Sequence, residues 1–330
     1  MVDVAAAAGV STATVSRALV HPEGVTAPLV ERVRLAVEQL HYVPNPAARA
    51  LSSLHTRLVG VLVVSLTDPV LGDALAAAQQ ALAEAGFGVL VAVTGGGQPA
   101  TDAAAQLMAA RDVEGLLVFG GAPPAQGARG AREARAPTVV LDGNPGAEGP
   151  LRCDVDYRLA GETIGHFLAG RGHRAWAFVA GAEASGRSAP LRAGLRAAFG
   201  RIGAAEVTAP APGFRPPVAV LRGRAEDWIR RPLTPTALVC ADDLTALAML
   251  KACAAAGLAV PGRMSIVGCG DAPFAALAMP ALTTLRIPGA TLGREAVRLL
   301  LAARVQAPAV PTLLRCKLVV RQSSGAPPPD

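Results

Sequence analysis

A regular alternation of short apolar runs with helical stretches dominates the chain from Leu58 onward. The runs that predict strands are LVGVLVV at 58–64, FGVLVAV at 87–93, GLLVF at 115–119, PTVVLD at 137–142, AWAFVAG at 175–181, TALVCAD at 236–242 and MSIVG at 264–268. Several of the helical stretches between them end at a glycine, such as Gly86, Gly170 and Gly257. Continuous apolar strands that alternate with helices are typical of parallel sheets covered on both faces. Residues 58–322 are enough for two such doubly wound α/β lobes.

The first 42 residues have a different pattern, without period-two alternation or clusters of β-branched residues. They predict an all-α headpiece of three short helices, the first from Val2 to about Ala8 and the second from Thr12 to about Val20. Ser11 and Thr26 are suitable N-caps for the second and third helices. In the third helix, apolar residues recur at helical spacing: Val30, Val33, Val37 and Leu40.

The segment DVAAAAGVSTATVSRAL, residues 3–19, fits a helix-turn-helix. Ala5 and Gly9 stand four residues apart, which suits a steep helix crossing and a tight turn with a positive φ at the glycine. The small core that fixes this angle would consist of Val4, Val10, Val15 and Leu19. The exposed face of the second helix would then present Thr12, Ala13, Ser16 and Arg17. An ordinary alanine-rich helical hairpin has the same spacing, so spacing alone leaves both interpretations open.

Several longer stretches follow one another along the chain: VAAAAGVSTATVSRAL, YVPNPAARAL, PTALVCADDLTALAML, GLAVPGRMSIVGCGD, PALTTLRIP, LGREAVRLLL and LVVRQSS. In sequence and in order, these stretches resemble the LacI/GalR family of repressors, the last five matching that family's sensor domain. The resemblance covers essentially the whole chain. It implies a headpiece at 1–43, a hinge at 44–57 and a sensor at 58–322 of the periplasmic-binding-protein type I fold. We expect the proline-rich tail, 323–330, to be disordered.

The resemblance also implies which residues contact DNA. The second helix would read base edges in the major groove through Thr12, Ala13 and Arg17, supported by Ser11, Thr14 and Ser16. Asn45 to Leu54 correspond to a hinge helix that folds on DNA, in which Arg49 reaches phosphates or the groove floor. Leu51 would insert into the minor groove and kink the duplex. A linker leucine packed on the sensor is the alternative role for Leu51.

In the sensor, the resemblance implies an effector cleft at the carboxyl ends of the strands. The expected effector residues are Asp68, Arg192, Phe214, Asp243 and Asp271. Asp68 and Asp243 could equally be helix N-caps. The chain departs from the family pattern where Leu191 replaces an arginine, Gly270 replaces an aspartate, and Val70-Leu71 replaces an aromatic pair. Sugars need bidentate polar groups and a stacking aromatic, so we expect an effector that is not a simple sugar.

The start of the chain also departs from the family. Its relatives carry several further residues before the equivalent of Asp3, including a Thr or Ser that caps the first helix. The sequence therefore predicts an N-terminally shortened headpiece with an uncapped first helix.

Composition excludes several other classes of protein. The formal net charge of +6 permits a nucleic-acid partner, but residues 1–57 contain five arginines against four carboxylates, so charge does not locate the DNA-binding end. The five cysteines are odd in number and lack metal-ligand spacing, which predicts buried thiols and no metal or cofactor: Cys153, Cys240, Cys253, Cys269 and Cys316. No apolar run is long enough to span a membrane, and Arg17 interrupts the N-terminal apolar stretch, which predicts a cytoplasmic protein without a signal peptide.

Together these features predict a DNA-binding transcriptional repressor that binds a pseudo-palindromic operator as a homodimer and is modulated by a small-molecule effector. No leucine-zipper heptad follows Arg321, so dimers are expected rather than tetramers. The alternative is a solute-binding protein of the periplasmic type without DNA binding. An enzyme is not expected, because no catalytic triad, metal spacing or phosphate loop is present; Gly95-Gly96-Gly97 lacks the Lys-Ser/Thr of a P-loop.

Overall fold

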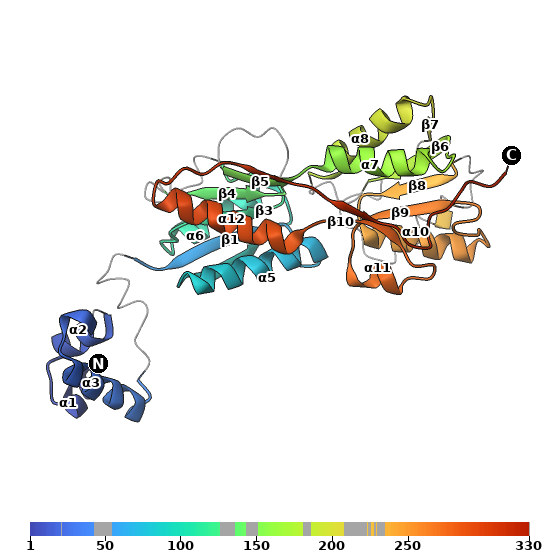
Figure 1. The fold of residues 1–330 in the computed structure, drawn as a ribbon. Coiled ribbons are helices and arrows are strands. Elements are labelled where there is room, and N and C mark those ends of the chain that lie inside the picture. The colour runs from blue at the N-terminus through green and yellow to red at the C-terminus, as the bar shows by residue number, and fades with distance from the viewer. Residues whose placement is uncertain are drawn as a thin grey trace. The chain divides into compact units, whose positions relative to one another are not determined.

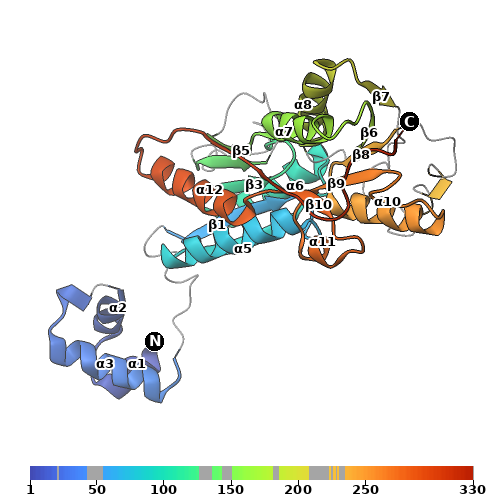
Figure 2. The ribbon, with the colours of Figure 1, turned by 45° about the vertical axis from the view of Figure 1, so that its right-hand side comes forward.

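A computed structural model describes residues 1–20, 22–42, 55–125, 136–142, 151–180, 186–207 and 235–329, together with Gly223, Glu226, Asp227 and Ile229. It divides into two compact units, Met1–Arg57 and Leu58–Asp330. Figures 1 and 2 show the elements of each unit from two directions.

The first unit is the expected bundle of short helices. Its elements are α1 (Val2–Ala8), α2 (Thr12–Val20), the 3-10 turn η1 (Pro22–Gly24) and α3 (Ala27–Gln39). Their buried side chains, among them Val4, Val15 and Val33, form one small core. Thr26 stands at the N-cap position of α3, but its side chain makes no capping hydrogen bond. Leu40 lies beyond the end of α3 and is exposed, so the apolar pattern overestimated this helix by one residue.

The second unit consists of two lobes, each built on a six-stranded sheet. The first lobe has strand order β11-β5-β4-β3-β1-β2, and all its pairings are parallel. Its strands are β1 (Leu58–Val63), β2 (Gly88–Val93), β3 (Leu116–Phe119), β4 (Thr138–Leu141), β5 (Leu151–Val155) and β11 (Thr312–Leu314). One face of the sheet packs on α5 (Pro69–Glu84) and α12 (Gly289–Arg304), and the other on α6 (Gln98–Ala109).

The second lobe has strand order β12-β10-β9-β8-β6-β7, and only β12 runs antiparallel to its neighbour. Its strands are β6 (Ala175–Val179), β7 (Ala205–Val207), β8 (Ala237–Cys240), β9 (Ser265–Gly270), β10 (Thr283–Arg286) and β12 (Lys317–Val319). The helices α7 (Tyr157–Ala169) and α8 (Ser188–Gly200) pack on one face, and α10 (Asp243–Ala255) on the other. A short helix, α11 (Pro273–Leu277), follows β9.

The strand residues alternate between two clusters in both lobes, as expected for sheets covered on both faces. In β1, Val61 faces α5 and α12, whereas Leu62 faces α6. The edge strand β2 departs from the expectation of a buried strand, because Val91 and Val93 are about half exposed. Gly86 and Gly257 have a positive φ, which lets the chain turn just after α5 and α10. After α7, the glycine with a positive φ is Gly172, and the predicted Gly170 has a right-handed helical conformation.

The chain crosses between the lobes three times. It leaves the first lobe after β5, returns after β10 to build α12 and β11, and crosses again to form β12. Beyond β12, the expectation of a disordered tail is wrong for the described residues 323–329. Ser323 is fully buried, donates through Oγ to the Ile266 carbonyl at 2.6 Å and accepts from the Thr283 amide at 2.8 Å. Proline content did not reveal these hydrogen bonds, which depend on residues distant in the sequence.

Candidate functional site

The turn between α1 and α2 has the geometry that the sequence predicts. Gly9 adopts a left-handed conformation with φ 63°, and the Val10 amide donates to the Ala5 carbonyl at 3.0 Å. The Ser11 hydroxyl caps α2 by accepting from the Thr14 amide at 3.1 Å. These bonds fix the direction in which α2 leaves the turn.

One face of α2 is packed and the other is open. Val15 is fully buried, and Val10 and Leu19 pack against the same small core. On the other side Ser11, Thr12, Ala13 and Arg17 are exposed, and Thr14 and Ser16 are half-buried. The open face therefore presents small and hydroxyl side chains with one arginine.

The arginines within α1–α3 have different environments. Arg32 donates to the Ala8 carbonyl at 2.8 Å and so ties α3 to the end of α1. Arg34 forms ion pairs with Glu31 at 2.6 Å and Glu38 at 2.5 Å. Arg17 makes only a long bond, 3.4 Å, to the carbonyl of Ala13, and no ion pair among the described residues. Its guanidinium is thus free to bind an anion or a base edge.

In the second unit, a charged cluster lies where the two lobes meet. Asp68 follows β1 and caps α5, with Oδ1 accepting from the Val70 amide at 3.0 Å. Asp142 follows β4, and Arg187 precedes α8. Arg187 Nη2 donates to Asp68 Oδ2 at 2.9 Å and to Asp142 Oδ2 at 3.2 Å, and the Tyr157 hydroxyl donates to Asp142 Oδ1 at 2.5 Å. The two carboxylates belong to the first lobe, whereas Arg187 and Tyr157 belong to the second.

The protonation states in this cluster follow from burial and charge. Burial alone would lower the pKa of Arg187, but the negative charges of Asp68 and Asp142 outweigh it, and the pKa lies well above its usual value. Burial, with the charge of Asp142, raises the pKa of Tyr157 well above its usual value. Arg187 therefore stays charged and Tyr157 remains a donor.

Comparison with known proteins accounts for both units. Residues 1–45 match the model of bacterial regulatory proteins of the lacI family, and residues 166–324 match the periplasmic binding protein-like domain. The HTH-type transcriptional regulator GntR of Pseudomonas aeruginosa is 31% identical over 307 residues, which are 91% of this chain and 88% of that protein. The chain belongs to the lacI family of bacterial regulatory proteins.

Other members of the lacI family align over nearly the full length. The HTH-type transcriptional repressor CytR of Escherichia coli K12 is 28% identical, covering 99% of this chain and 97% of that protein. A crystal structure described as the Lac repressor dimer bound to operator and the anti-inducer ONPF superposes with a TM-score of 0.84, at 27% identity and 98% coverage of both chains. The predicted fold and the prediction of a transcriptional regulator that is not an enzyme are confirmed.

Asp243, a further carboxylate predicted for the effector site of this lacI-family member, has its partners within the second lobe. Asp243 is buried, accepts from the Ala272 amide at 2.7 Å and from the Thr284 hydroxyl at 2.5 Å. The N-cap of α10 is Asp242 and not Asp243, because the Asp242 carboxylate accepts from the Thr245 amide. Asp68 is an N-cap, so one of the two alternative roles left open by the sequence is present there.

Among the described residues, the remaining predicted effector side chains have ion-pair partners other than Asp68. Asp271 forms ion pairs with Arg286 and Arg321, both at 2.6 Å. Arg192 pairs with Glu206 of β7 at 2.6 Å, on the partly exposed side of α8. Phe214 and the predicted hinge residues Asn45, Arg49 and Leu51 lie outside the described residues.

The predicted effector residues did not include Arg187, Asp142 or Tyr157. The family pattern directed attention to Leu191, three residues before Gly194, and Leu191 is fully buried. The arginine that contacts Asp68 and Asp142 is instead Arg187, four residues earlier. Two features of the sequence could have indicated these residues. Asp142 ends a predicted strand, and Arg187 lies four residues before the position where the family has an arginine.

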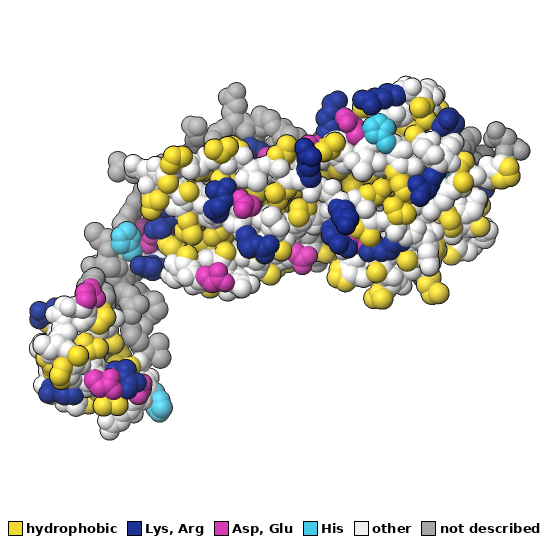
Figure 3. Space-filling view, viewed as in Figure 1, with side chains coloured by type: hydrophobic (Ala, Val, Ile, Leu, Met, Phe, Trp, Pro, Cys, Tyr) yellow, Lys and Arg dark blue, Asp and Glu magenta, His cyan; other side chains and the backbone are white. Residues whose placement is uncertain are grey.

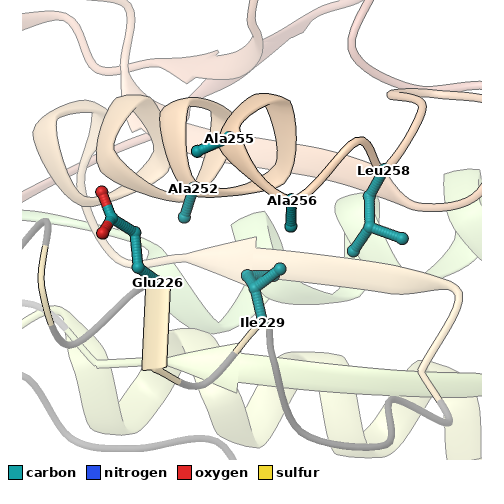
Figure 4. A pocket seen from close by; sticks show the side chains of 6 residues that line it. All are labelled: Glu226, Ile229, Ala252, Ala255, Ala256 and Leu258. Carbon is teal, nitrogen blue, oxygen red and sulfur yellow. The ribbon is translucent and has the colours of Figure 1, made fainter.

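A pocket elsewhere on the second lobe does not involve the predicted residues. This cavity of about 340 Å³ lies beside the C-terminal half of α10 and is lined by Glu226, Ile229, Ala252, Ala255, Ala256 and Leu258. Figure 4 shows that Glu226 carries the one charged group among the six labelled side chains that line it. Within the described ranges, no group of three or more His, Cys, Asp or Glu side chains could hold a metal ion, and no helix has the length and apolarity to cross a membrane.

Proposed function

We propose that the chain is a repressor that binds an operator through the exposed face of α2. The observation that carries this proposal is the open face of α2, with Thr12, Ala13 and the unpaired Arg17. A guanidinium on a helix in the major groove can donate two hydrogen bonds to a guanine, and Ser11, Thr14 and Ser16 can contact phosphates. Such a protein acts where the chromosome is, which in a bacterium is the cytoplasm.

The operator is an inverted repeat, bound by a homodimer. Residues 44–57 form the hinge in this proposal. Arg49 contacts the DNA backbone or groove floor, Asn45 begins the hinge helix, and Leu51 inserts at a central pyrimidine–purine step, CG by family resemblance. Selection of bound sequences from random DNA tests this directly. A pair of inverted half-sites around such a step is expected, whereas a single asymmetric half-site would refute the proposal.

Apolar side chains that point into solvent support a dimer. Leu277 and Met279, in and just after α11, are 81% and 88% exposed. Figure 3 shows hydrophobic side chains projecting at the rim of the second lobe over α11. Exposed apolar groups of this size are typical of interfaces. Leu277→Asp should therefore shift the protein from dimer to monomer in sedimentation, whereas Leu107→Asp, on α6, should leave the dimer intact.

The effector binds between the two lobes and is not a simple sugar. Leu191 offers no hydrogen bond, Asp68 is engaged by Arg187, and Asp271 is engaged by Arg286 and Arg321. A sugar ring bound there would leave hydroxyls unsatisfied, at about 1–3 kcal/mol each. Thermal-shift and calorimetric screening against common hexoses, pentoses and sugar phosphates should show no micromolar binding. A micromolar sugar that also changes operator affinity would contradict this proposal.

A further inference from the structure

Arg187 joins the two lobes through one guanidinium group. It precedes α8 in the second lobe, and its Nη2 atom lies 2.9 Å from Asp68 Oδ2 and 3.2 Å from Asp142 Oδ2, both in the first lobe. The Tyr157 hydroxyl adds a third bond between the lobes, to the other oxygen of Asp142. Any opening of the lobes at this point must separate all these pairs.

The surroundings make that separation costly. Arg187 and Asp142 are 2% and 3% exposed. One apolar cluster includes buried residues of both lobes, among them Val70, Leu71, Leu191 and Cys269. Opposite charges attract each other strongly in an environment that excludes water. If one charged partner is removed, the other is left buried without a compensating charge. The Nε atom of Arg187 has no hydrogen-bond partner, so the guanidinium is held mainly by the two carboxylates.

We propose that Arg187 is a built-in occupant of the interlobe site that holds the lobes together in the absence of an effector. The guanidinium supplies from the protein itself the interlobe contacts that a bound ligand would otherwise provide. We call the bonds from Arg187 to Asp68 and Asp142 the clamp. Its role in regulation rests on the proposed function. An effector that separates the lobes must first break the clamp, and its apparent affinity is therefore reduced.

Hydrogen exchange on the full-length protein tests the clamp without DNA or effector. In Arg187→Met, amides of the first lobe at 66–75 and 138–142 should exchange at least about tenfold faster than in the wild type. Arg192→Met is the matched control, because Arg192 is also an ion-paired arginine near the start of α8, but its partner Glu206 lies in the same lobe. It should leave the first-lobe amides unchanged.

A chemical rescue separates the clamp from a merely structural role. In Arg187→Ala, millimolar methylguanidinium should restore slow exchange at 66–75 and 138–142, whereas tetramethylammonium, which has the charge but no N–H donors, should not. Should the Met and Ala variants fail to fold, Arg187→Lys should show faster first-lobe exchange, because it cannot reproduce the planar guanidinium. Unchanged exchange in the folded Arg187 variants would overturn the clamp, while the operator proposal would still depend only on the DNA selection.

Discussion

The carboxylate of Asp243 shows how one buried acid can control stability. Burial raises its pKa to about 6, although the Thr284 hydroxyl and the Ala272 amide favour the charged form. The pKa of an unfolded Asp is about 3.9. The folded state therefore holds this proton more tightly, and the stability that results is complete below about pH 4 and is lost as the pH rises through about 6.

Asp243→Asn mimics the protonated acid and should remove this dependence. We expect the free energy of unfolding of the wild type, relative to the variant, to fall between pH 4 and pH 6. At pH 7 the variant should be more stable by about 1–3 kcal/mol. Urea unfolding at a series of pH values measures the difference. Parallel pH curves for the two proteins would show that Asp243 does not titrate in this range.

Arg17→Ala tests the base-reading role of α2. The substitution should cost about 1–3 kcal/mol of specific binding and relax the preference at one base pair per half-site. Arg34→Ala is the control, because Arg34 is neutralised by Glu31 and Glu38 and should matter less. Binding of a panel of operator variants measures both. Wild-type base preference in Arg17→Ala would mean that another residue reads the operator.

Single residues were predictable where local sequence decides their role. Gly9 and Ser11 act within a few residues of their partners, so the turn and the cap of α2 could be predicted. Arg187 could not, because its partners are 119 and 45 residues away in the sequence. The family register points to Leu191, and Arg192, predicted beside it, pairs with Glu206 on β7, a partner that the local sequence does not indicate.

At the scale of elements, the crossing of α7 and α8 depends on glycines. A Cβ on Gly194 would lie 2.0 Å from the Arg158 carbonyl oxygen, and a Cβ on Gly161 would lie 2.0 Å from the Leu191 carbonyl oxygen. The two backbones therefore touch, and no side chain fits between them.

Gly194→Ala should force these helices apart and destabilise the protein by about 1–3 kcal/mol or more. Gly200→Ala, at the end of the same helix, meets nothing within 4 Å and should be neutral or stabilising by up to about 1 kcal/mol. Thermal unfolding of both variants measures the contrast. Equal melting temperatures would contradict the close crossing.

Strands were predictable when nearly all their residues were apolar. The seven apolar runs correspond to β1, β2, β3, β4, β6, β8 and β9. The strands not predicted are short or carry polar residues, such as β5 (LRCDV), β7 (AEV) and β12 (KLV). These strands form because they pair with strands that are distant in the sequence, and their own composition does not indicate a strand.

At the scale of the whole molecule, the C-terminal segment holds the second lobe together. Besides the bonds of Ser323, the Gly325 amide donates to the Ser265 hydroxyl at 3.0 Å, and Nε2 of the buried His173 lies 3.0 Å from the Gly325 carbonyl oxygen. Removing the segment leaves these buried groups without partners, at about 1–3 kcal/mol each.

A chain that ends at Gln322 should therefore unfold at a clearly lower urea concentration, with a loss of at least about 3 kcal/mol. A chain that ends at Pro327 retains every one of these contacts and should match the full-length protein. If both truncated chains unfold at the same midpoint, the segment contributes nothing to stability.

Because the chain passes between the two lobes three times, the first lobe is completed late during synthesis on the ribosome. The first lobe begins at Leu58, yet its sheet is complete only when β11 pairs with β5, Thr312 opposite Cys153. At about 5–20 residues per second, the nascent chain waits on the order of ten seconds between the two strands. Throughout that interval β5 has an open edge, which can pair with other chains. The lobe that is started first is therefore among the last parts to be finished.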